Sequence, residues 1–182
     1  MDSVEIKKRY EVRKMTPNEQ IGSFNCGDLD LNDFLLNDAA PFRKALLAVT
    51  YLFEEKNTKQ IAAFFSLAND KVSLSDFESK TEFNRFRKVR FVNEKRLKSY
   101  PAAKLCRLGV NESLKGHRIG TVILDFIKSF FVIDNKTGCR FLTVDAYADA
   151  APFYLKNGFV SFHDEDRNED TRLLYFDLKD VS

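Results

Sequence analysis

One stretch near the middle of the chain combines an apolar strand-like run, a short basic loop and the start of an apolar helix. The run is Leu105 to Val110, the loop is Lys115 to Gly120, and a helical pattern follows from Thr121 to Ile133. The first N–H groups of a helix have no acceptor inside it, and the helix dipole adds partial positive charge there. Small residues let an anion approach these groups closely. The loop therefore predicts a diphosphate site, with further donors on Lys115, His117 and Arg118.

Glycines and basic residues also precede helices in ordinary strand-to-helix turns, so the loop alone leaves both interpretations open. Two known phosphate loops do not fit. No Gly-Lys-Ser or Gly-Lys-Thr ends the loop, which excludes a Walker loop, and the three-glycine dinucleotide pattern is missing.

Two motifs together resemble the GNAT acetyltransferases. Residues 115–120, Lys-Gly-His-Arg-Ile-Gly, are similar to the family's Gln/Arg-x-x-Gly-x-Gly/Ala motif, which holds the pyrophosphate of acetyl-coenzyme A. Residues 150–159, Ala-Ala-Pro-Phe-Tyr-Leu-Lys-Asn-Gly-Phe, match its Ala-x-x-Phe-Tyr-x-x-x-Gly-Phe. The first motif departs from the family at Lys115, in place of Gln or Arg, and at Arg118, in place of Gly. An arginine at a glycine position predicts an ordinary helical backbone there rather than a positive φ.

The resemblance implies a role for each part of these motifs. Acetyl-coenzyme A is the implied cosubstrate, and its pantetheine arm is expected to pair with backbone groups of Leu108, Gly109 and Val110. The implied diphosphate contacts come from Lys115, Gly116, His117, Arg118, Ile119, Gly120 and Thr121. Tyr154 is the implied general acid, because a phenol with an ordinary pKa of about 10 is protonated at neutral pH. The alternative is that Tyr154 is only a core aromatic residue.

No general base is assigned from the sequence. Many relatives use a Glu on a central strand, but residues 104–110 contain no acid. Asp145 ends the next predicted strand and Asp149 opens the next predicted helix, and each could act as a base, cap a helix or hold a loop. An acceptor amine of low pKa would need no base. The Asn that many relatives carry four residues before the position of Ala150 is missing here.

The order of predicted elements favours a mixed α/β fold. The expected strands are 10–15, 45–53, 61–68, 104–110, 139–146, 159–162 and 172–178, and the expected helices are 29–39, 119–133 and 149–156. Pro41 should end or kink the first helix. This order suits one mostly antiparallel sheet with helices on both faces and two parallel central strands, which splay apart in GNAT proteins. We expect a single GNAT-like domain over residues 1–182, with an irregular basic excursion at about 69–103.

Composition excludes several other classes of protein. The chain has 182 residues, 44% of them hydrophobic, with no run long enough to span a membrane and no signal-peptide pattern at its N-terminus. The three widely spaced cysteines are expected to be buried reduced thiols. They and the two histidines show no metal-ligand spacing, so no metal site is expected. These features predict a cytoplasmic enzyme.

The uneven distribution of charge along the chain is relevant to the choice of acceptor substrate. The net charge is +2, yet residues 80–98 hold eight basic and two acidic residues, interleaved with three phenylalanines, and residues 164–170 hold five acids and one arginine. A primary amine of a small molecule or a protein is the main expectation. Segments 24–35, 50–52 and 65–67 are also similar to toxin-type GNAT acetyltransferases, which acetylate aminoacyl-tRNA, and the basic stretch would suit a phosphate backbone. A non-catalytic acetyl-coenzyme A-binding module and a homodimer also stay open.

Overall fold

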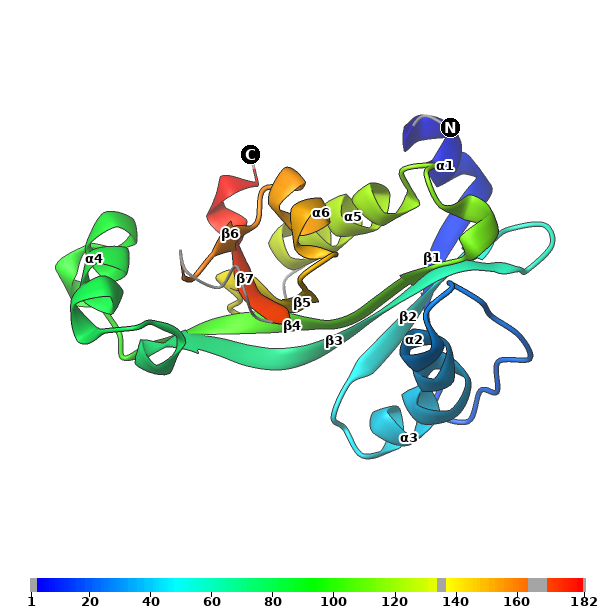
Figure 1. Ribbon diagram of the computed structural model, residues 1–182, viewed down its shortest axis with the longest axis horizontal. Coiled ribbons are helices and arrows are strands. Elements are labelled where there is room, and N and C mark those ends of the chain that lie inside the picture. The colour runs from blue at the N-terminus through cyan, green and yellow to red at the C-terminus, as the bar shows by residue number, and fades with distance from the viewer. Residues whose placement is uncertain (1–2, 134–136, 164–169, 182) are drawn as a thin grey trace. The chain divides into compact units, whose positions relative to one another are not determined.

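The computed structural model describes residues 3–133, 137–163 and 170–181, so most of the acidic stretch 164–170 and part of the expected helix stop at 134–138 lie outside it. Seven strands form one mixed sheet in the order β1-β2-β3-β4-β5-β7-β6 (Figure 1). The strands are β1 (Tyr10–Lys14), β2 (Val49–Glu55), β3 (Ile61–Ser73), β4 (Ser99–Val110), β5 (Phe141–Tyr147), β6 (Val160–Ser161) and β7 (Thr171–Asp177). The helices are α1 (Ser3–Arg9), α2 (Leu29–Asp33), α3 (Ala39–Lys44), α4 (Lys80–Arg90), α5 (Ile119–Ile133) and α6 (Ala151–Lys156).

The chain divides into two compact units. The first comprises Met1–Ala68 and Leu105–Ile127, and the second comprises Asn69–Lys104 and Lys128–Ser182. β3 and β4 therefore contribute residues to both units. The basic loop belongs to the first unit and Tyr154 to the second.

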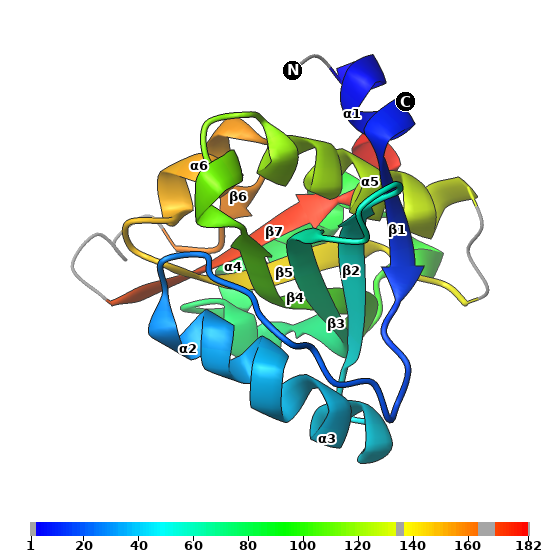
Figure 2. The same cartoon turned by 90° about the vertical axis from the view of Figure 1, so that its right-hand side faces the viewer.

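The first unit contains the predicted hairpin, with a helix layer on each face of it. β2 and β3 pair antiparallel, as predicted, and β1 pairs with β2 as the edge strand. Successive side chains of a strand point to opposite faces. Phe64 of β3 therefore packs with Phe24 and Phe34, on the side where Figure 2 shows α2 and α3, whereas Phe65 contacts Phe126 of α5.

The first predicted helix is three consecutive helical segments rather than one. Asp28 caps it as expected, because its carboxylate accepts a hydrogen bond from the Leu31 N–H at 3.0 Å. α2 passes through a π-helical turn at Phe34–Asp38 into α3, which continues through Pro41. Pro41 therefore does not end the helix, and the π-helical turn lies directly before the segment that contains it.

In the second unit, α4 covers an aromatic cluster. Phe83 and Phe86 are only 3% and 7% exposed, and the Phe86 ring lies 5.5 Å from Phe141 and 5.6 Å from Tyr175 between centroids. The irregular excursion predicted at about 69–103 is therefore shorter than expected, because β3 extends to Ser73, β4 begins at Ser99 and the packed helix α4 lies between them. These two phenylalanines of the basic stretch belong to the core, so they are not available to stack on nucleic-acid bases.

β4 and β5 run parallel, as predicted. Their pairing covers three positions, Ala102 to Lys104 opposite Phe141 to Thr143, and both strands continue beyond it. α5 has the predicted bounds. α6 begins two residues later than predicted and is closed by Gly158 with a φ of 84°, as the expected C-cap requires.

The expectation of three buried cysteines is wrong for two of them, since Cys26 is buried whereas Cys106 and Cys139 are partly exposed; none of the three forms a disulfide. Within the described ranges, every helix is too short or too polar to cross a lipid bilayer.

Candidate functional site

Two residues of the basic loop, residues 115–120, have left-handed backbone conformations. Gly116 has a φ of 80° and Arg118 a φ of 64°. The expected helical backbone at Arg118 is therefore wrong. The chain must turn sharply between the 3₁₀ turn Glu112–Leu114 and α5, and left-handed residues make such turns within few residues. At a non-glycine residue this conformation costs on the order of 1 kcal/mol, which the glycine of the family motif avoids.

The start of α5 leaves a set of N–H groups for a ligand. The first helical bond runs from the Val122 N–H to the Arg118 C=O at 3.1 Å. The N–H groups of Ile119, Gly120 and Thr121 precede this bond and have no acceptor within the helix. Ile119 is buried and anchors the turn, whereas the other two residues are partly exposed. Left-handed residues followed by a helix N-terminus form a concavity of N–H groups that favours anions.

The three basic side chains of the loop lie differently. His117 Nδ1 lies 3.3 Å from the Leu114 O and 3.1 Å from the Lys115 O, so this nitrogen carries the proton and a neutral ring offers Nε2 only as an acceptor. Lys115 Nζ lies 3.0 Å from the position that a Cβ on Gly27 would take, so this side chain packs over Gly27. Arg118 is exposed and is the strongest of the three as a phosphate ligand.

A hydrogen-bond network that the sequence analysis missed holds the 3₁₀ turn before the loop. The Glu112 N–H donates to the Asn25 C=O at 2.9 Å, and Asn25 Nδ2 donates to Glu112 Oε2 at 3.3 Å. Asn32 in turn accepts from the Cys26 N–H at 2.8 Å and donates to Asn25 Oδ1 at 3.0 Å. The signal in the sequence was the pair of asparagines on either side of Cys26, whose side chains can bond to nearby backbone groups.

The strand segment Leu108–Val110 packs on the phenylalanine core of the first unit. A Cβ on Gly109 would lie 2.6 Å from Cε1 of Phe64, so only glycine fits here. Directly after the segment, the Asn111 N–H donates to the Ala62 C=O at 2.8 Å. This packing fixes the backbone that is expected to pair with the pantetheine arm.

Tyr154 lies in α6, in the second unit. Its ring packs against Phe153 and Phe159 at 5.1 and 5.5 Å between centroids, and the residue is 7% exposed. Burial raises the pKa of Tyr154 to about 12, because a phenolate is poorly solvated there. Tyr154 is thus a packed aromatic residue that keeps its proton throughout the neutral range.

The two acids considered as bases have different surroundings. Asp145 lies inside β5 and forms an ion pair with Lys104 of β4. Asp149 is exposed and is not the N-cap residue of α6. A further acid that the sequence analysis missed is Asp70 of β3, which accepts a hydrogen bond from Thr143 Oγ1.

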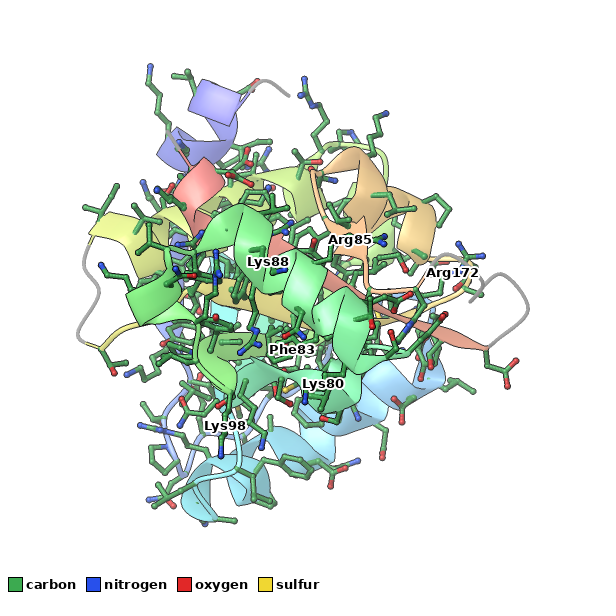
Figure 3. The ribbon with its side chains drawn as sticks, turned by 90° about the vertical axis from the view of Figure 1, so that its left-hand side faces the viewer. Lys80, Phe83, Arg85, Lys88, Lys98 and Arg172 are labelled. Atoms are coloured by element: carbon green, nitrogen blue, oxygen red, sulfur yellow. The ribbon has the colours of Figure 1, made fainter. Side chains whose placement is uncertain are left out.

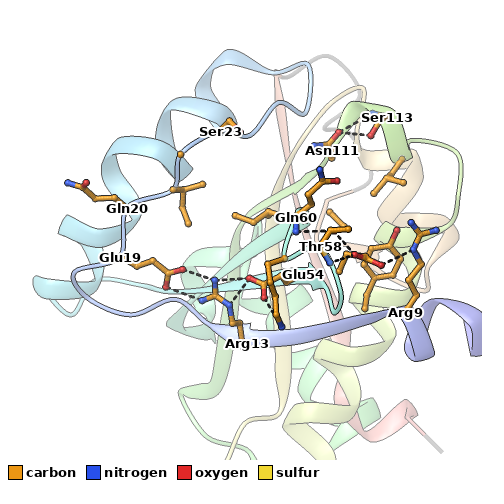
Figure 4. Close-up of a pocket in the computed structure, with 18 residues that line it drawn as sticks. Arg9, Arg13, Glu19, Gln20, Ser23, Glu54, Thr58, Gln60, Asn111 and Ser113 are labelled. Atoms are coloured by element: carbon orange, nitrogen blue, oxygen red, sulfur yellow. Dashed lines mark hydrogen bonds and ion pairs between the residues drawn. The ribbon is translucent and has the colours of Figure 1, made fainter.

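A groove of about 720 Å³ in the first unit borders the segment that leads into the basic loop (Figure 4). Asn111 and Ser113 lie at one end of it. In its wall, Arg13 pairs with Glu19 at 2.6 Å and with Glu54 at 2.8 Å. The lining of the groove combines three basic residues, Arg9, Arg13 and Lys59, with three acidic residues, Glu19, Glu54 and Glu55, so its formal charges cancel and we assign it no part in the chemistry.

Arg118→Gly should separate the role of the side chain from that of the backbone. Both Arg118→Gly and Arg118→Ala remove the guanidinium, but only glycine adopts a φ of 64° without strain. If the guanidinium contacts a phosphate, both variants should bind coenzyme A about 10-fold more weakly and bind phosphate-free pantetheine unchanged. Isothermal titration calorimetry with the two ligands measures this. Equal weakening for both ligands would make Arg118 a structural residue.

Comparison with known families identifies the domain. Residues 54–178 match the family described as Acetyltransferase (GNAT) domain. This range covers more than half of the chain and includes the strand segment 108–110, the basic loop and Tyr154.

Solved structures with about one-fifth identical residues have a similar fold. A crystal structure of a tyrosine-to-phenylalanine variant of KacT matches with a TM-score of 0.75 and 21% identity, over 95% of this chain and 97% of that one. AtaT complexed with acetyl-methionyl-tRNAfMet matches with a TM-score of 0.70 and 20% identity, over 94% and 96% of the two chains. AtaTR bound with acetyl-coenzyme A matches with a TM-score of 0.69 and 19% identity, over 96% of each chain. The predicted fold class is therefore confirmed.

Proposed function

The chain belongs to the GNAT acetyltransferase family, and from this premise we propose that it acetylates a primary amine of a small molecule or a protein. It is an N-acetyltransferase whose acetyl donor is acetyl-coenzyme A. The main support for placing the donor's diphosphate at residues 115–121 is the left-handed backbone of Gly116 and Arg118, directly before α5. A concavity of N–H groups at a helix N-terminus suits that ligand.

Each segment of the site has one task in this proposal. Residues 115–121 hold the diphosphate, and the backbone of residues 108–110 pairs with the pantetheine arm as a neighbouring strand would. The donor supplies an activated thioester. The protein must then receive a neutral amine and stabilise the thiolate that leaves.

We assign the stabilisation of the thiolate to Tyr154. At a pKa of about 12, this phenol is a weaker acid than a thiol, whose ordinary pKa is about 8.5. Full proton transfer from Tyr154 to the thiolate is therefore unfavourable. Hydrogen-bond donation to the developing thiolate carries no such penalty, so Tyr154 acts as a donor and water supplies the final proton.

An acceptor screen with labelled acetyl-coenzyme A tests the proposal. The panel should contain small primary amines, lysine-containing peptides and aminoacyl-tRNA. Label transfer to a small amine or a peptide supports the proposal, and transfer to aminoacyl-tRNA alone replaces it by the second candidate below. Binding of acetyl-coenzyme A without transfer or hydrolysis would make the protein a non-catalytic binding module.

The surface of α4 favours a second candidate, transfer to the amino group of aminoacyl-tRNA. Five basic side chains of the stretch 80–98 are exposed, namely Lys80, Arg85, Lys88, Lys95 and Lys98. Figure 3 shows Lys80, Arg85 and Lys88 along α4, with Lys98 on a neighbouring segment. Such a surface can contact a phosphate backbone. The similar protein AtaT has been solved with acetyl-methionyl-tRNAfMet.

Other cations of the same stretch serve the fold. Arg90 donates to the Tyr175 hydroxyl at 2.7 Å, and Arg87 donates to the Leu97 C=O at 2.9 Å. The surface available to a nucleic acid is therefore smaller than the sequence indicates, and substitutions that test it should avoid these two arginines.

Charge reversal on α4 should distinguish the two candidates. The double variant Arg85→Glu, Lys88→Glu should weaken binding of aminoacyl-tRNA at least about 10-fold and lower the salt slope of log K by about 2, if each residue contacts one phosphate. The matched control Lys7→Glu, Lys8→Glu makes the same change in net charge on exposed positions of α1. Filter binding across a salt series measures both. Equal losses of aminoacyl-tRNA binding in the two double variants would mean that only the net charge of the protein matters, and not the surface of α4.

A further inference from the structure

We propose that the Asp145 carboxylate binds the amino group of the acceptor, within a group of side chains that includes Asp70, and that the Lys104 ammonium occupies this position when no acceptor is present. The proposal rests on the proposed function, because an amine acceptor is the ligand that this site takes. All three residues lie in the second unit.

The three strands β3, β4 and β5 bring these side chains together. Lys104 and Thr143 form the last pair of the parallel ladder between β4 and β5. Residues two apart on a strand share a face, so Thr143 and Asp145 point the same way. Lys104 forms its ion pair with Asp145, and Thr143 Oγ1 donates to Asp70. The group therefore lies where the ladder between β4 and β5 ends.

An ionic group is unusual at this place in a sheet. Strands of a parallel pair are commonly apolar on both faces, and Phe141, Leu142 and Val144 are at most 3% exposed here. The side chains of Lys104 and Asp145 are nevertheless 33% and 47% exposed. A ligand from solvent can therefore reach the ion pair.

The charges of the group favour a cationic ligand. Asp70, Lys104 and Asp145 together carry one net negative charge at neutral pH. The acceptor's amino group is chemically the same as the end of the Lys104 side chain, so a carboxylate that binds one can bind the other. Partly exposed ion pairs contribute little to stability, so the exchange of Lys104 for the acceptor costs little.

Two variants break the ion pair from opposite sides and should act in opposite directions. Glycinamide serves as the acceptor, and release of the coenzyme A thiol is the signal. Asp145→Asn should raise the KM for glycinamide about 10- to 100-fold, the loss expected for a charge-assisted hydrogen bond, and leave the KM for acetyl-coenzyme A unchanged. Lys104→Gln removes the competing ammonium and should lower the KM for glycinamide. If the ion pair is purely structural, both variants should change the KM for glycinamide in the same direction, and that result would overturn the proposal.

An exposed ion pair elsewhere supplies the control. Glu11 and Lys59 lie 2.8 Å apart with side chains 42% and 61% exposed, and Glu11→Gln and Lys59→Gln should leave the KM for glycinamide unchanged. If Asp145→Asn fails to fold in a thermal melt, Lys104→Gln still tests the proposal through its lowered KM.

Two different results distinguish the absence of this acceptor site from the absence of the proposed activity. Wild-type protein that binds acetyl-coenzyme A in calorimetry but releases no thiol with glycinamide would overturn the acceptor site alone. Protein that does not bind acetyl-coenzyme A would overturn the proposed function itself.

Discussion

Tyr154→Phe is expected to lower turnover by about 10²- to 10³-fold, the usual range for loss of one hydrogen-bond donor to a developing anion. The exchange keeps the ring that packs against Phe153 and Phe159 and removes only the hydroxyl. The loss corresponds to about 2.7 to 4 kcal/mol of transition-state stabilisation. Steady-state thiol release with the best acceptor measures it, and folding and acetyl-coenzyme A affinity should barely change.

A turnover number within a few fold of the wild-type value would contradict this assignment. Tyr154 would then be a core aromatic residue, and another group or water would serve the leaving sulfur. The slow hydrolysis of acetyl-coenzyme A provides the signal if the acceptor screen finds no substrate.

The same variant checks the burial of the hydroxyl independently of activity. The folded pKa of Tyr154, about 12, lies above the ordinary value of 10. The folded state therefore holds this proton more tightly, which contributes stability that is fully present below pH 10 and is lost as the pH rises from about 10 to about 12. Chemical unfolding at pH 9 and pH 11 should show this loss in the wild type and a smaller one in Tyr154→Phe.

Gly120→Glu is expected to weaken acetyl-coenzyme A binding by at least about 100-fold, or about 2.7 kcal/mol. Gly120 lies in the first turn of α5, whose N–H groups are proposed to hold the diphosphate. The new carboxylate would take the same N–H groups and repel the diphosphate. An acidic residue in the first turn of a helix is favourable to the helix itself, so the variant should fold.

Two matched variants separate charge from bulk at this position. Gly120→Gln has nearly the shape of Gly120→Glu without its charge, and Gly120→Ala adds one methyl group that the family motif accepts. Calorimetry should rank binding as wild type and Gly120→Ala first, Gly120→Gln next and Gly120→Glu last. Unchanged affinity in a folded Gly120→Glu protein would exclude the first turn of α5 as the diphosphate site.

Local sequence patterns determined the elements around both motifs. α5 has the predicted bounds because its apolar positions repeat with the helical period, and Ile119, Ile123 and Ile127 are buried. The β2–β3 hairpin and the Asp28 cap were predicted because their signals lie within a few residues of each other. Such signals act over one turn or one loop, so they depend little on the rest of the fold.

Tertiary structure decided the features that local preference could not. The backbone of Arg118 was predicted wrongly because residue type sets a preference of only about 1 kcal/mol against a left-handed φ, which the turn into α5 overcomes. The phenylalanines of α4 have a spacing that suits either an exposed face or a core. Only the packing of Phe86 on Phe141 and Tyr175 decided between the two.

The same division holds for the candidate site. The sequence alone determined the GNAT motifs and predicted the diphosphate site at residues 115–120 and the role of Tyr154, because each is a short contiguous pattern. The contacts of Lys104 with Asp145 and of Asp70 with Thr143 join residues 41 and 73 positions apart. A shift of one residue in the register of a strand would turn its side chains to the opposite face of the sheet. Short motifs therefore indicate candidate residues from the sequence, whereas strand register decides which side chains of different strands meet.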